Sequence, residues 1–110
     1  MSEQERRRWI IGLIKRGIKR RLAVQVAGAR QGEGFRVLES SPLQLKEAYD
    51  KGHSVIEVAL AASLSNEEAL QLLVRDGAVM RRFGPGRNRK KTESIEERVR
   101  RCRAIIFSKV

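Results

Sequence analysis

Residues 54–77 read SVIEVALAASLSNEEALQLLVRDG, and this stretch predicts two short helices joined by a tight turn. Ser54 with Glu57, and Ser65 with Glu68, have the Ser-x-x-Glu spacing of a capping box. In a capping box the serine and the glutamate accept hydrogen bonds from each other's backbone N–H groups at the start of a helix. The stretch therefore predicts a mainly helical core.

A third short helix is predicted immediately before this pair. Ser41 and Pro42 supply a cap and a first-turn proline, LQLKEAYDK supplies the helix, and Gly52 ends it. Gly77 is placed to end the last of the three helices in a left-handed conformation. Residues 42–77 are accordingly predicted to form a trihelical core.

The segment VALAASLSNEEAL within this core resembles the helix-turn-helix pattern. In that family a small residue of the first helix packs under the second, a small residue marks the turn, and an apolar residue locks the second helix. The corresponding residues here are Ala59, Ser63, Leu64 and Ala69 with Leu72 or Leu73. The resemblance implies a DNA-binding fold whose second helix is the recognition helix.

The following residues resemble the winged branch of the helix-turn-helix DNA-binding superfamily, so the resemblance covers residues 42–91. AVMRRF predicts a strand, and GPGRNRKK predicts a basic wing-like loop, residues 78–91 in all. Glycines in such a loop let it lie close to a phosphate backbone, and its cations suit a narrow minor groove. A second wing strand is missing after Lys91, so the loop is either one-sided or pairs with an earlier hairpin.

Additional elements are predicted on both sides of the core. Residues 1–22 predict a basic amphipathic helix, and residues 23–40 predict a β-hairpin because LAVQVAG alternates and ARQGEG supplies turn glycines. The alternative, a first helix that continues through Ala27, stays open. Residues 94–107 predict a C-terminal helix with an apolar stripe, from which we expect a homodimer. The stripe consists of Ile95, Val99, Cys102 and Ile106.

The chain of 110 residues is predicted to be a single domain, residues 1–110, mainly α with a small β component. Its formal charge of +11 is unevenly distributed. Residues 1–22 carry eight Lys or Arg against two acids, residues 23–80 five against eight, and residues 81–110 eleven against three. A large net charge opposes compactness and serves polyanion binding, so an anionic partner is expected.

Two groups of side chains form the predicted nucleic-acid site. They are Arg81, Arg82, Arg87, Asn88, Arg89, Lys90 and Lys91 around the basic loop, and Lys15, Arg16, Lys19 and Arg20 in the first helix. Glu67 and Glu68 at the start of the recognition helix oppose this interpretation, because they repel phosphates. Either they cap the helix and complement its dipole, or one reads a cytosine, or the protein does not read DNA. The first explanation is favoured because Glu68 already has a capping role.

The sequence thus predicts a small cytoplasmic protein, nucleoid-associated if its source is prokaryotic, that binds double-stranded DNA and acts as a transcription regulator or accessory factor. An RNA- or ribosome-associated protein and a protein-interaction adaptor are the alternatives. One histidine, His53, and one cysteine, Cys102, make neither a zinc site nor a disulfide. No catalytic motif surrounds either residue, and no apolar run is long enough to span a membrane. We therefore expect no enzyme activity, cofactor, metal or small-molecule substrate.

Overall fold

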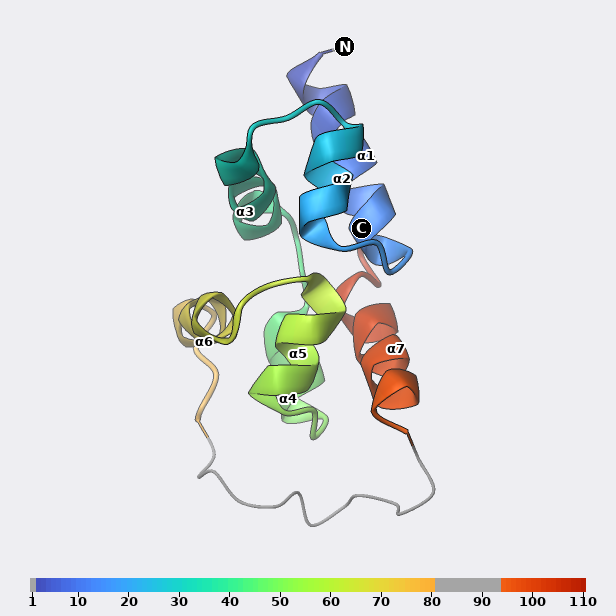
Figure 1. Ribbon diagram of the computed structural model, residues 1–110. Helices are drawn as coiled ribbons and strands as arrows, with labels where there is room; N and C mark the ends of the chain where they lie inside the picture. The colour runs from blue at the N-terminus through green and yellow to red at the C-terminus, as the bar shows by residue number, and fades with distance from the viewer. Residues whose placement is uncertain (1, 81–93) are drawn as a thin grey trace.

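The structure is a computed structural model that describes residues 2–80 and 94–110, which form seven α-helices and no β-strand (Figure 1). The helices are α1 (Glu3–Lys15), α2 (Arg20–Val26), α3 (Gln31–Ser40), α4 (Leu45–Asp50), α5 (Val55–Ala62), α6 (Asn66–Arg75) and α7 (Ile95–Ile106). The predicted β component is wrong for these residues, because α2 and α3 replace the hairpin of residues 23–40 and residues 78–80 form no strand. The rest of the predicted strand and basic loop, residues 81–91, lies outside the described residues.

The first helix is shorter than predicted, because α1 ends at Lys15 rather than near Leu22. Gly17 adopts a φ of 95°, which breaks the helix. The N–H of Ile18 then donates to the carbonyl of Leu13 at 3.0 Å and closes the helix end. The predicted basic amphipathic helix is therefore two helices, α1 and α2, that meet at a tight turn.

The alternation in LAVQVAG comes from a helix rather than from a strand. Ala23 and Val24 of α2 and its C-cap residue Ala27 are buried, and this spacing of one and four matches one face of a helix. Leu22 and Val26 are exposed on its other side. The period-two pattern of the sequence was misleading because both faces of this short helix carry apolar residues.

Gly34 lies inside α3 instead of in a predicted turn. A β-carbon at this position would lie 2.8 Å from Val24 Cγ2 and 2.9 Å from Arg20 Cγ, so any larger residue would force these side chains or the two helices to shift. The low helix propensity of glycine is thus offset by close packing.

The three helices expected in residues 42–77 are present as α4, α5 and α6. Both predicted capping boxes are confirmed, since each serine side chain accepts from the backbone of its glutamate and each glutamate side chain accepts in return. α4 begins at Leu45, with Gln44 as its cap, so the predicted start at Ser41 and Pro42 is wrong.

The helices α1–α3 and α4–α6 form two trihelical units with the same spacing along the chain. α3 and α6 each contain 10 residues and begin at positions 31 and 66, so equivalent residues are 35 positions apart. The left-handed residues follow the same offset: Gly17 matches Gly52, and Gly28 matches Ser63, with φ angles of 95°, 107°, 69° and 56°. We call residues 2–41 the first unit and residues 42–78 the second unit.

Hydrogen bonds at the turns repeat with this offset as well. The N–H of Ala29 donates to the carbonyl of Val24 at 3.0 Å, and that of Leu64 donates to the carbonyl of Ala59 at 2.8 Å. Within each unit every helix packs against the other two. The chain is therefore a tandem of two like trihelical units, stacked one above the other in Figure 1.

α7 packs beside α5 and α4 of the second unit (Figure 1). It buries Val99, Cys102 and Ile106, whereas Ile95 is exposed. The stripe that predicted a homodimer is therefore largely covered within the chain. None of the helices in residues 2–80 and 94–110 is long and apolar enough to cross a membrane.

Candidate nucleic-acid interface

The start of α2 meets the second unit at the turn between α5 and α6. The N–H of Arg20 donates to Ser63 Oγ at 2.7 Å. Arg20 Nη1 lies 3.0 Å from Glu68 Oε1. These contacts fix the first turn of α2, where Lys19, Arg20 and Arg21 follow one another.

The sequence at this helix start is unfavourable for a helix. Lys19 is the N-cap residue of α2 and makes no side-chain capping bond, and no acid lies in the first turn. A helix N-terminus carries a partial positive charge, so three successive cations there lower helix stability. Helix formation does not account for these cations, and local conflicts of this kind are typical of functional sites.

Glu68 has two structural roles at the start of α6. Its carboxylate accepts from the N–H of Ser65 at 2.8 Å and also pairs with Arg20. Burial alone raises the pKa of Glu68, but the hydrogen bonds from Ser65 and Arg20 and the charge of Arg20 outweigh it, so the pKa lies below its ordinary value. Glu68 is therefore already occupied by the cap and by the contact between the two units.

A groove of about 900 Å³ lies between the start of α2, the turn from α5 to α6, and α7. We call it the basic groove, because its cationic side chains are Lys19, Arg20, Arg21, Arg100 and Arg103, while Glu96 is its acidic one. Ala59, Leu64 and Val99 contribute apolar surface to it. The groove thus brings together cations that lie about 80 positions apart in the sequence.

Arg103 joins the two sides of the basic groove. Its Nε donates to the carbonyl of Ala61 at 3.1 Å. Its Nη1 lies 3.2 Å from the place where a β-carbon on Gly17 would be, so the guanidinium packs on the turn between α1 and α2. Lys19, Arg21 and Arg100 are exposed and remain accessible to an anion.

The structure brings only part of the predicted site into this groove. Lys19 and Arg20 line it, whereas Lys15 and Arg16 at the end of α1 do not, and Lys15 Nζ donates to the carbonyl of Val110 at 3.1 Å. The predicted residues Arg81, Arg82, Arg87, Asn88, Arg89, Lys90 and Lys91 lie outside the described residues.

Sequence reasoning missed Arg21, Arg100 and Arg103. Arg21 continues the cationic run of Lys19 and Arg20, and that run was a usable signal. The arginines of α7 have no such signal, because they are distributed around the helix. No local pattern indicates that this helix packs beside α5 and faces the start of α2.

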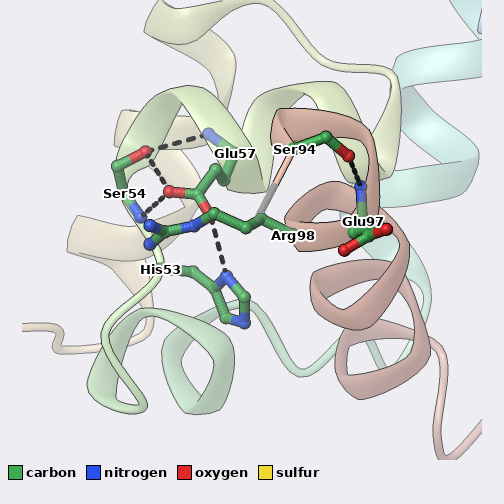
Figure 2. A network of polar contacts seen from close by, with 6 residues as sticks. All are labelled: His53, Ser54, Glu57, Ser94, Glu97 and Arg98. Atoms are coloured by element: carbon green, nitrogen blue, oxygen red, sulfur yellow. Dashed lines mark hydrogen bonds and ion pairs between the residues drawn. The ribbon is translucent and has the colours of Figure 1, made fainter. Parts of the chain in front are cut away.

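A second polar cluster surrounds the carboxylate of Glu57 (Figure 2). Oε1 accepts from Arg98 Nε at 2.9 Å and lies 3.1 Å from His53 Nδ1, while Oε2 accepts from Ser54 Oγ at 2.9 Å. Burial by itself raises the pKa of Glu57, but the hydrogen bonds from His53, Arg98 and Ser54 outweigh it and lower the pKa to about 2.

This cluster is a structural connection rather than a catalytic site. Glu57 is buried and ionised, and its acceptor positions are occupied, so it is not a useful general base near neutral pH. Through Arg98 it attaches α7 to α5, and Ser94 caps the start of α7 by accepting from the N–H of Glu97 (Figure 2). The cluster therefore holds the helix that carries Arg100 and Arg103.

Cys102 is also a structural residue. It is fully buried in α7, and this burial together with the charge of Glu57 raises the pKa of its thiol to about 12. A thiol with such a pKa is not a nucleophile near neutral pH.

No protein-family model, curated protein or solved structure matches the chain. The two units differ in charge. The first unit carries ten Lys or Arg and four acids, and the second unit carries three Lys or Arg and six acids.

Proposed function

We propose that this protein binds double-stranded DNA and acts as a regulator or accessory factor of helix-turn-helix form. The observation that carries the proposal is the basic groove, which cations from the start of α2 and from α7 line together. Cations that neutralise several neighbouring phosphates supply most of the affinity of such proteins. The proposal includes no wing strand.

The backbone geometry of both units supports the helix-turn-helix form. In each unit a left-handed residue, Gly28 or Ser63, joins two helices, and a small buried residue of the second helix, Gly34 or Ala69, follows six positions later. Small residues at these places let the two helices cross closely, as in the known DNA-binding motif.

The first unit is the one that we assign to DNA. The last helix of this unit, α3, exposes Arg36, and the exposed Arg30 precedes it. The equivalent positions of the second unit hold Gln71 and Ser65, and Glu67 is exposed beside them. Because phosphates repel carboxylates, α3 is the better recognition helix, and Glu67 of α6 does not line the basic groove.

A preference for duplex over single strands follows from the aromatic residues. Proteins that bind single strands stack bases on exposed aromatic rings. Among the described residues Tyr49 and Phe107 are buried, Phe35 is partly buried and Trp9 is exposed. These rings form no stacking platform, whereas the cations of the groove suit a phosphate backbone.

The test is a salt titration of binding to a labelled duplex and to a single strand of the same length. The variant Arg21→Ala with Arg100→Ala removes one cation from each side of the groove. Its control, Lys46→Ala with Lys51→Ala, removes the same charge from exposed positions of the second unit outside the groove. We expect the protein to bind the duplex more tightly than the single strand. The negative slope of log affinity against log salt should become shallower by about 1.8 in the groove variant and remain unchanged in the control.

Equal effects of the two variants would show that only net charge matters and would remove the groove from the site. A preference for the single strand would favour the RNA-binding alternative. An absence of binding at low salt would reject the nucleic-acid proposal.

A further inference from the structure

The two units differ in what covers the outer face of their middle helix. In the second unit α7 covers α5: Arg98 bonds Glu57, and Arg103 bonds the carbonyl of Ala61. The residues 35 positions before Glu57 and Ala61 are Leu22 and Val26 of α2. Within the described part of the chain, no helix covers this face of α2.

The uncovered face of α2 is apolar. Leu22 and Val26 lie one turn apart on α2 and are 50% and 55% exposed, and Ile18, which precedes the N-cap residue Lys19, is 38% exposed. We call these three residues the α2 stripe. They do not line the basic groove. Lys19 is exposed beside the stripe, and α2 contains no acid, so the rim of the stripe is cationic.

A complementary face lies on α6 of the second unit. Leu70 and Val74 are four residues apart and are 42% and 59% exposed. Glu67 is exposed one turn before Leu70. We call these three residues the α6 face. It presents apolar side chains with an acidic rim, on the unit in which acids exceed cations.

From this complementarity we infer that the α2 stripe of one chain docks on the α6 face of a second copy. The contact covers α2 with a helix, as α7 covers α5, and it buries the exposed Leu22, Val26, Leu70 and Val74. Opposite charges at the two rims, with Lys19 on one and Glu67 on the other, favour this pairing and orient it.

Such a contact joins two different surfaces and is therefore heterologous. Each added copy leaves a free α2 stripe at one end and a free α6 face at the other, so assembly either continues as a chain or closes into a ring. Direct packing of two α2 stripes is disfavoured, because it would bring the cationic rims of both copies together.

The test uses two variants and needs no DNA, so it is independent of the proposed function. Leu22→Asp with Val26→Asp disrupts the α2 stripe, and Leu70→Asp with Val74→Asp disrupts the α6 face. All four side chains are exposed, so the fold is expected to persist, and circular dichroism checks this. Sedimentation velocity then measures the state of the wild type, of each variant, and of an equal mixture of the two.

We expect the wild type to self-associate and each variant alone to be monomeric. The mixture should form a one-to-one heterodimer, because it contains one intact α2 stripe and one intact α6 face. Wild-type protein that stays monomeric, self-association that survives either pair of substitutions, or a mixture that stays monomeric would each overturn the inference. Self-association that survives only in the variant with the α6 substitutions would indicate packing of two α2 stripes instead.

Discussion

The two units begin their middle helices in opposite ways. The N-cap residue of α5, Ser54, forms a complete capping box with Glu57. The equivalent N-cap residue of α2, Lys19, makes no side-chain capping bond. The loss of such a cap costs on the order of 1 kcal/mol. The same backbone arrangement therefore has a well-capped helix start in the second unit and a cationic helix start in the first. The cap residues of the second unit stabilise the fold, whereas we propose that the cations of the first unit bind DNA.

The left-handed turns of the two units differ as well. The first unit has Gly28, which adopts its φ of 69° without strain, whereas Ser63 adopts 56° in the second unit. The strain at Ser63 is offset by a hydrogen bond, in which the N–H of Arg20 donates to Ser63 Oγ. The second unit thus uses its turn to hold the first turn of α2 in place.

The largest expected effect comes from the carboxylate that attaches α7 to the second unit. Glu57→Ala leaves Arg98 without its ion-pair partner, and we expect a loss of about 3–5 kcal/mol in the free energy of unfolding, measured by urea denaturation. Glu47→Ala, on the exposed side of α4, is the control and should change stability by less than about 0.5 kcal/mol. Similar losses in both variants would contradict the role of the cluster.

The lowered pKa of Glu57 predicts that the stability of the folded protein decreases in acid. Because the pKa of Glu57 falls from an ordinary 4.5 to about 2 in the folded state, its stabilisation is complete above pH 4.5 and is lost as the pH falls toward 2. We expect Glu57→Gln to lack this part of the pH dependence, on the order of 3 kcal/mol between pH 6 and pH 2. Parallel stability curves for the wild type and the variant would rule out this contribution.

A smaller effect is expected at the close crossing of α2 and α3. Gly34→Ala adds a methyl group that meets Val24, and we expect a loss of about 1–3 kcal/mol in thermal or urea unfolding. Gly32→Ala in the same helix is the matched control, because nothing lies within 4 Å of its β-carbon position, and it should stabilise by about 0.5–1 kcal/mol. If both variants gain stability, the crossing is looser than described.

Local signals predicted the second unit well and the first unit poorly. Capping boxes at Ser54 and Ser65 mark helix starts without help from the rest of the chain, and they were confirmed. The N-cap residues of α2 and α3, Lys19 and Arg30, make no side-chain capping bond, and Gly34 lies inside α3 for a reason that only tertiary packing supplies. Their helices depend on contacts that a local pattern does not show.

The tandem arrangement was missed because few equivalent residues coincide. Gly17 matches Gly52, Ala27 matches Ala62, Glu33 matches Glu68 and Leu38 matches Leu73, whereas other pairs share only apolar character or differ in kind. Of the cations that line the basic groove, the sequence predicted only Lys19 and Arg20. Arg100 joins them through the packing of α7 on α5, which no spacing within the sequence indicates.

We propose that the first unit and α7, rather than the acidic start of α6, face DNA. Backbone amide chemical shifts recorded by nuclear magnetic resonance during addition of a short duplex test it most directly. We predict the largest changes at Lys19–Arg21, at Arg30 and Arg36, and at Arg100 and Arg103, with small changes at Asn66–Glu68. Chemical-shift changes centred on Asn66–Glu68, with none at the basic groove, would show that the start of α6 faces DNA instead.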